Sequence, residues 1–277
     1  MNGYGSGGFG GLPPVVKNFL LINVVLFLIT YFIPIRGFNL VERLSVYYFQ
    51  SENFKPHQLL THMFMHGGFG HIFFNMFGLY MFGRIIENIW GSKRFFILYL
   101  AAGFGAIFLH QFIIWMQYNP LMKTVEIFLS NPNVDIFSNL VENHPKFFVS
   151  GVYEFINNWQ REPANTSFIG QAVESVNNIS ASVHASVFNV PLLGASGAIF
   201  GLLAAFATLF PNVELMLIFL PIPIKAKYIV PFYAVIELFF GVANFKGDNI
   251  AHFAHLGGAI VGFIIVKFWK KNQFRIY

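Results

Sequence analysis

Long apolar runs, separated by short polar segments, dominate the hydrophobic pattern of this chain. A helix that crosses a membrane needs about 20 mostly apolar residues, and the pattern predicts six such helices. Their expected ranges are 17–34, 69–90, 95–116, 194–210, 226–243 and 251–269. We therefore expect an all-α polytopic membrane protein built as a bundle of six transmembrane helices.

Prolines and glycines in the intervening segments help to place the ends of these spans. The charged turn Gly91-Ser92-Lys93-Arg94 separates the second span from the third. Residues 213–225 are apolar but contain Pro221 and Pro223, and proline breaks the hydrogen-bond ladder of a helix. We predict that this segment forms a loop at the membrane interface rather than a seventh span.

The remaining segments define the expected domain organisation. Residues 1–16 form a glycine-rich flexible tail, and residues 17–277 form the membrane domain. The first span follows Lys17 without a small-residue cleavage site, so we expect it to be retained. A long extracytoplasmic insertion at about 117–193 follows the third span, and stretches such as 147–159 could form amphipathic helices on the membrane surface. No internal repeat supports an inverted-repeat transporter.

The composition agrees with a membrane protein and excludes several chemistries. Only 10% of the residues are charged and 56% are hydrophobic, whereas soluble domains carry roughly 25% charged residues. The mean hydropathy is +0.59. The chain has no cysteine, so it can form neither a disulfide, a thiolate nucleophile nor a cysteine-ligated metal site.

The distribution of the basic residues predicts the orientation in the membrane. With a cytoplasmic N-terminus, ten of the 17 lysines and arginines lie in the inside segments, together with two of the 12 acidic residues. This bias follows the positive-inside rule and places both termini in the cytoplasm. The net charge of +5 is explained by topology, and we expect no nucleic-acid partner.

The first chemically suggestive segment is Gly194-Ala195-Ser196-Gly197. It places Ser196 in the first turn of the fourth span, on the outer side of the membrane. Free N–H groups and the positive end of the helix dipole favour a developing anion there, so a serine nucleophile would have part of an oxyanion hole already built. Alternatively, these small residues serve only to pack helices together.

The second such segment is Ala254-His255-Leu256-Gly257-Gly258. It places His255 about one turn inside the outer boundary, at a depth similar to Ser196. Gly258 and Gly262 share the helix face of His255, and Gly197 and Gly201 form a similar face on the fourth span. These faces would allow a hydrogen bond between Ser196 and His255, and we favour His255 over the neighbouring His252 as a base.

Further polar side chains enter the predicted bundle from the same outer side. His71 and Asn75 are four residues apart on one face of the second span, and both can donate hydrogen bonds to an oxyanion without carrying charge. Alternatively, they tie helices together. Glu237 lies within the fifth span and could orient a histidine, although we expect a structural hydrogen bond, and Asp248 precedes the sixth span. A Ser–His dyad is therefore the economical hypothesis.

Together these segments resemble the rhomboid intramembrane serine proteases, in particular the bacterial type with six spans. The resemblance covers about 15–34, 56–116 and 190–270. The matching motifs are His62-x-x-x-His66-x-x-x-x-His71-x-x-x-Asn75, Gly83-Arg84-x-x-Glu87, Gly194-x-Ser196-Gly197 and Ala254-His255-x-x-Gly258. The four motifs occur in the family's order and at matching depths.

The resemblance implies a nucleophile, Ser196, and a general base, His255. It implies an oxyanion hole formed by His71, Asn75, Gly194 and the backbone N–H of Ser196. The implied substrates are single-pass transmembrane proteins in the lipid bilayer, cut near the outer membrane boundary, and no cofactor or metal is implied. The expected location is the cell (plasma or inner) membrane, with the active site opening to the extracytoplasmic side.

The resemblance also implies a mobile cap at residues 244–250 and a movable fifth span, and the sequence departs from the family at two places. His57-Gln58 replaces a Trp-Arg pair that many members carry, and Phe200 replaces a tyrosine that stacks on the catalytic histidine in some of them. Phe200 can still stack but has no hydroxyl. Neither departure affects the dyad, so we expect an active enzyme.

Two alternatives remain at the level of the sequence. One is a catalytically silent rhomboid-like binder or chaperone of transmembrane segments. The other is a membrane metalloprotein, since His62 and His66 are four residues apart and His252 and His255 are three apart, although no HExxH motif occurs. The sequence does not indicate the oligomeric state.

Overall fold

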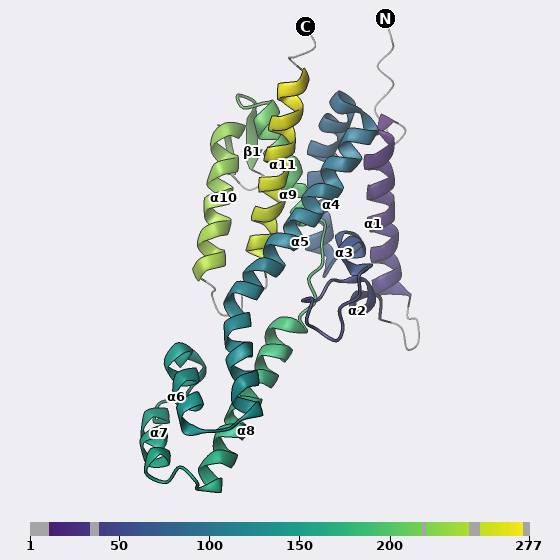
Figure 1. The fold of residues 1–277 in the computed structure, drawn as a ribbon. Helices are drawn as coiled ribbons and strands as arrows, with labels where there is room; N and C mark the ends of the chain where they lie inside the picture. The colour runs from purple at the N-terminus through teal and green to yellow at the C-terminus, as the bar shows by residue number, and fades with distance from the viewer. Residues whose placement is uncertain (1–10, 34–38, 218–219, 244–249, 274–277) are drawn as a thin grey trace, which may run out of the picture. The chain divides into compact units, whose positions relative to one another are not determined.

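The computed structural model describes residues 11–33, 39–217, 220–243 and 250–273. The described chain is mainly helical, as predicted, and divides into two compact units (Figure 1). The membrane unit comprises residues 1–47, 54–110 and 191–277, and the inserted unit comprises residues 48–53 and 111–190. Residues 1–10 of the expected tail and 244–249 of the expected cap lie outside the described residues.

The membrane unit contains the helices that the apolar pattern predicts. They are α1 (Pro14–Phe32), α4 (Phe69–Gly78) with its continuation η3 (Leu79–Gly83), the first part of α5 (Arg84–Ser130), α9 (Ser196–Leu209), α10 (Ala226–Ala243) and α11 (His252–Gln273). By length and composition, four described helical runs can cross a membrane, and α9 is a shorter apolar helix. The longest run, Phe69–Ser130, turns at Gly91, where φ is 77° and ψ is 163°. It therefore contains two of the predicted spans.

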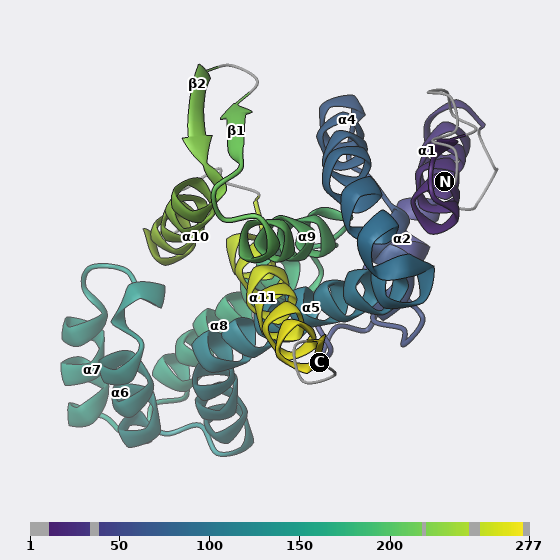
Figure 2. The same cartoon turned by 90° about the horizontal axis from the view of Figure 1, so that it is seen from above.

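Helix α9 lies in the middle of the membrane unit, with α4, α5, α10 and α11 around it (Figure 2). The core of this unit includes Leu79, Leu98, Ala198, Leu202 and Val266. Helix α1 begins and α11 ends at the same end of the bundle (Figure 1), which agrees with two termini on one side of the membrane. Helices α4, α9 and α11 all begin at the opposite end, where Ser196 lies.

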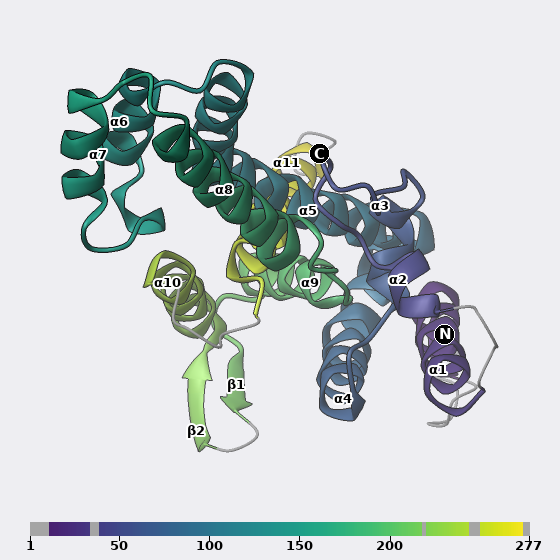
Figure 3. The same cartoon turned by 90° about the horizontal axis from the view of Figure 1, so that it is seen from below.

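The segment before α10 is a β-hairpin and not the predicted interfacial loop. Strands β1 (Glu214–Leu217) and β2 (Leu220–Lys225) pair antiparallel, with Glu214 opposite Lys225. The hairpin extends outward beyond α10 (Figures 2 and 3). The prolines do exclude a helical span, as expected, but extended backbone tolerates proline at the edge of a two-stranded sheet.

Two short helices and a turn form the connection between α1 and α4. They are α2 (Leu40–Leu44), α3 (Gln58–Thr61) and η2 (His62–Phe64). The pair His57-Gln58 holds this connection together, since His57 Nε2 lies 2.9 Å from the carbonyl oxygen of Arg43 and Gln58 Oε1 accepts a hydrogen bond from Lys55 N. These residues therefore fix the loop that leads to α4.

The inserted unit is a helical structure with its own core. Its helices are α6 (Val134–Asn143), η4 (Pro145–Phe147), α7 (Val152–Arg161), α8 (Thr166–Val183) and η5 (His184–Phe188), together with the last part of α5. Ile156 and Trp159 of α7 are buried in this core. The amphipathic helix predicted here is present. The membrane surface expected on its apolar side is not, because this side packs on other helices of the inserted unit.

Helix α5 continues beyond its predicted end at residue 116 and ends only at Ser130. It contains Pro120, although proline inside a helix costs a hydrogen bond and about 3 kcal/mol. Leu121, Val125 and Phe128 follow it and are buried in the core of the inserted unit. This apolar packing supports the helix past the proline.

Candidate active site

Close packing between α9 and α11 brings the two predicted catalytic segments together. A methyl group on Gly258 would overlap the carbonyl oxygen of Gly197, and one on Gly262 would overlap that of Gly201. Glycines at these positions therefore allow backbone-to-backbone contact between the helices, as the sequence predicted. Gly197 also faces Ala106 of α5 without room for a side chain, so three helices meet at this point.

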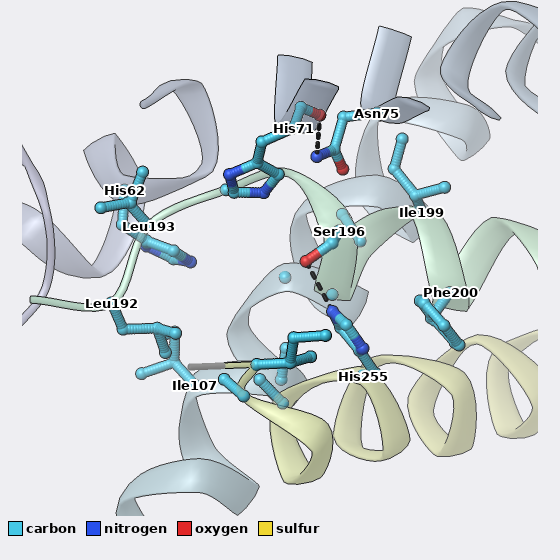
Figure 4. A pocket seen from close by; sticks show the side chains of 18 of the residues that line it. His62, His71, Asn75, Ile107, Leu192, Leu193, Ser196, Ile199, Phe200 and His255 are labelled. Atoms are coloured by element: carbon cyan, nitrogen blue, oxygen red, sulfur yellow. Dashed lines mark hydrogen bonds between the residues drawn. The ribbon is translucent and has the colours of Figure 1, made fainter. Parts of the chain in front are cut away.

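Ser196 and His255 lie at the start of these helices and face one another (Figure 4). His255 Nε2 lies 2.8 Å from Ser196 Oγ. The His255 ring stacks on Phe200, with ring centroids 4.3 Å apart and planes only 5° apart. The predicted stacking on Phe200 is confirmed, and it fixes the plane of the imidazole that contacts the serine.

His252 has a different partner from the Ser196 hydroxyl. Its Nδ1 atom lies 2.6 Å from Glu237 Oε2. The same carboxylate oxygen lies 3.0 Å from His255 Nδ1. Glu237 is thus next to both imidazoles, so the less expected of its two roles, orienting a histidine, is compatible with the geometry.

The serine and the histidine line a cavity of about 430 Å³. Besides Ser196 and His255, its lining includes His62, His71, Asn75, Phe74, Ile107, Leu192, Leu193, Gly194, Ile199, Phe200 and Ile250. Most of these side chains are apolar, and the polar groups gather around the Ser196 hydroxyl (Figure 4). Few polar groups in an apolar cavity are typical of a site that orients one polar bond of a ligand.

His71 can donate a hydrogen bond toward the serine. The N–H of Gly67 donates to His71 Nδ1 at 3.3 Å, so in a neutral ring the proton is on Nε2. This Nε2 atom is near Gly194, because a methyl group on Gly194 would lie 2.6 Å from it and 3.7 Å from Ser196 Oγ. His71 Nε2–H and the Ser196 hydroxyl therefore both lie next to Gly194, in the same cavity.

Asn75 lies one turn after His71 and lines the same cavity. Its amide nitrogen donates to the carbonyl oxygen of His71 at 2.8 Å. This bond uses one N–H and fixes the amide at the edge of the cavity (Figure 4). The other amide hydrogen is a second potential donor for an anion in the cavity.

Gly194 takes part differently from what the resemblance implies. Its φ of 126° is in the region that favours glycine, and its N–H donates to the carbonyl oxygen of His62 at 2.9 Å. The amide is therefore already bonded and is not a free donor in this arrangement. What Gly194 provides is space, since any side chain there would collide with His71.

Two histidines that precede α4, His62 and His66, are buried and uncharged next to the site. Burial lowers the pKa of His62 to about 4, and its Nδ1 donates to the carbonyl oxygen of Gln58 at 2.9 Å. Burial, with a smaller contribution from His71, lowers the pKa of His66 to about 3. Both imidazole rings are neutral at pH 7, so they make this side of the site polar without making it positively charged.

The four imidazoles of the metalloprotein alternative do not form a ligand set. Within the described parts of the chain, no three His, Cys, Asp or Glu side chains are grouped so as to hold a metal ion. His252 bonds to Glu237 and His62 bonds to Gln58. Both histidines therefore have protein partners in the described structure.

Comparison with known protein families matches the rhomboid domain at residues 53–122 and 166–271. An uncharacterised mitochondrial rhomboid protein of Schizosaccharomyces pombe is 25% identical over 221 residues, which are 78% of this chain and 52% of that protein. The mitochondrial RHOMBOID-like protein 12 of Arabidopsis thaliana is 27% identical over 250 residues, 88% of this chain and 56% of that protein. The chain thus spans about half the length of these two relatives.

A bacterial relative matches over a shorter region. The rhomboid protease GluP of Bacillus subtilis is 31% identical over 98 residues, which are 34% of this chain and 19% of that protein.

Proposed function

The chain belongs to the rhomboid family, and on that basis we propose that it is an intramembrane serine endopeptidase. Its substrates are single-pass transmembrane proteins, cleaved near the outer boundary of the membrane. The observation that carries the proposal is the 2.8 Å contact between His255 Nε2 and Ser196 Oγ inside a cavity. A pair of this kind activates a serine that is otherwise a weak nucleophile.

The proposed reaction is acyl transfer in two steps. His255 takes the Ser196 proton on Nε2 while Ser196 Oγ attacks the carbonyl carbon of the substrate. The resulting oxyanion is stabilised by His71 Nε2–H, by Asn75 and by the N–H of Ser196, which is free because α9 begins at that residue. His255 then gives its proton to the leaving amine, and water hydrolyses the acyl-enzyme by the same base catalysis.

The site requires water inside an apolar bundle. The polar side chains of His62 and His66, which precede α4, support the entry of this water. The glycines and histidines that precede α4 put non-helical backbone at this depth, which is tolerable only around a polar cavity. We propose that the cavity opens to the extracytoplasmic side of a cell membrane. Each of these proposals requires that the chain is a multi-pass membrane protein.

The decisive experiment compares the protein with its Ser196→Ala variant in proteoliposomes that contain a fluorescently tagged single-pass test substrate. We expect cleavage by the parent protein and none by the variant, with equal membrane insertion of the two. A fluorophosphonate probe should label Ser196 in the parent protein. Binding of the substrate without cleavage by the parent would favour the silent binder, and labelling of a different serine would disprove the assignment of Ser196.

A further inference from the structure

Glu237 is a buried carboxylate in the middle of an apolar helix. It lies in α10, and its side chain is only 11% exposed. An ionisable group inside a membrane helix is costly to bury and needs partners that offset the loss of water. Its partners here are two imidazoles of the neighbouring helix α11, His252 and His255, which approach the same oxygen, Oε2.

Aromatic rings fix both imidazoles around this oxygen. The His252 ring stacks on Phe240 of α10, with centroids 5.6 Å apart and planes 20° apart. The His255 ring stacks on Phe200 of α9. The carboxylate therefore lies between two rings whose planes are set by packing, and its position relative to His255 is defined by three helices.

The two distances indicate different interactions. His252 Nδ1 lies 2.6 Å from Glu237 Oε2 and forms an aligned hydrogen bond. His255 Nδ1 lies 3.0 Å from the same atom, but its N–H direction is not aligned with the carboxylate. A distance of 3.0 Å is within hydrogen-bond reach, and catalytic hydrogen bonds often become aligned only when substrate is bound.

The chemistry of the Ser196–His255 pair defines what His255 needs at Nδ1. For Nε2 to accept the serine proton, it must be unprotonated, so the proton of the neutral ring has to be on Nδ1. After proton transfer the ring carries a positive charge in a nonpolar environment. A carboxylate 3.0 Å from Nδ1 both favours this tautomer and stabilises the imidazolium, as an acidic residue does in serine proteases.

Building on the proposed peptidase function, we propose that Glu237 is a positioning residue that makes the dyad work as a triad. It holds His255 with the proton on Nδ1 and remains ionised while the serine proton moves to Nε2. His252 holds the carboxylate in place by its short hydrogen bond. Glu237 is not among the described residues that line the cavity, so it acts through His255 and not on the substrate.

The test compares kcat and KM of Glu237→Gln, Glu237→Asp and the parent protein on the single-pass test substrate. Glu237→Gln keeps the shape but removes the charge, and we expect kcat to fall about 100-fold or more while KM stays within about two-fold. The rate of fluorophosphonate labelling of Ser196 should fall in parallel. Glu237→Asp restores a carboxylate and should recover part of the lost kcat.

Glu87→Gln is a matched control, because Glu87 is also a buried glutamate of the membrane unit. Its carboxylate accepts hydrogen bonds from Val15 N and Val16 N at the start of α1, and from the Ser92 hydroxyl. We expect this variant to lower the melting temperature while kcat stays at the parent value. A loss of kcat in Glu237→Gln is then specific to the position of the carboxylate.

Three results would overturn the inference. They are an unchanged kcat in Glu237→Gln, a loss that matches only the unfolded fraction, and a Glu237→Asp variant no better than Glu237→Gln. If Glu237→Gln does not fold, ¹⁵N NMR of histidine-labelled parent protein gives the answer, with His255→Gln used to assign the signal. Nδ1–H in resting His255 supports the inference and Nε2–H contradicts it.

The peptidase proposal fails on a different result. Cleavage that persists in Ser196→Ala would disprove it whatever Glu237→Gln does. Loss of cleavage in Ser196→Ala combined with full activity in Glu237→Gln would remove only the role of Glu237.

Discussion

Gly258 of α11 packs directly on the backbone carbonyl of Gly197 of α9, one residue after the candidate nucleophile. His255 lies three residues before Gly258 and so on the same side of α11. The distance between Ser196 and His255 is therefore set by a contact between two backbones. Such a contact has no flexible side chain that could absorb a change.

Gly258→Val should separate α9 from α11, because its side chain has to displace the Gly197 carbonyl. We expect loss of measurable activity and a clearly lower melting temperature in detergent. Gly170→Ala in α8 is the matched control, since no atom lies within 4 Å of the added methyl group. That change in a helix should leave activity intact and raise stability by up to about 1 kcal/mol. Full activity in Gly258→Val would contradict the packing argument.

The two histidines of α11 should respond differently to substitution. His255→Ala removes the base bonded to Ser196 and should reduce cleavage to background. His252→Ala removes the hydrogen bond to the Glu237 carboxylate, and we expect about a ten- to 100-fold lower kcat, since a hydrogen bond to a charged group contributes about 1.5–3 kcal/mol. Initial rates on the test substrate measure both. The reverse order of the two effects would make His252 the base.

Removal of the oxyanion donors should lower kcat without affecting folding. His71→Ala and Asn75→Ala each remove one potential donor beside Ser196, and loss of one such donor typically costs about 100- to 1000-fold in kcat. The losses should be mainly in kcat, because the negative charge on the substrate carbonyl oxygen develops only in the transition state. Steady-state kinetics at saturating substrate test this. A change confined to KM would instead place these residues in substrate binding.

Stability should depend on pH through His62. Its pKa is about 4 in the folded protein and 6.5 in the unfolded chain, so between these values only the unfolded chain takes up the proton. The contribution of His62 is therefore fully present above about pH 6.5 and declines toward pH 4, by up to about 1.4 kcal/mol per pH unit.

Melting temperatures in detergent at pH 7.5, 6 and 5 measure this dependence. His62→Gln cannot take up a proton and should show a smaller decrease than the parent protein over this range. Equal decreases in the two proteins would show that His62 is charged in the folded state.

The sequence predicts the membrane helices well, because a span has to be apolar over its whole length. The glycine pattern also predicted the contact between α9 and α11, since helices meet closely where side chains are small. The sequence could not predict the hydrophobic core of the inserted unit. This core depends on how Phe137, Trp159 and Val176 come together from three helices. The continuation of α5 to Ser130, beyond the predicted end at residue 116, was missed for the same reason.

The site itself was only partly predictable. The sequence placed Ser196, His255 and His71 at one depth, and the structure brings them to one cavity. It could not show that Glu237 contacts both histidines of α11, because the rotation of α10 about its axis depends on packing. Nor could it show that the Gly194 amide is already bonded to His62.

The shortness of α9 has a consequence for the surrounding lipid. Its 14 residues span about 21 Å, less than the roughly 30 Å of a typical hydrocarbon layer. An upright helix of this length cannot reach both headgroup regions. Under the proposed function, the end that stays below the outer headgroups is the N-terminal one, which carries Ser196. A peptide bond can reach that depth only if the bilayer thins locally or the incoming segment bends down into the protein.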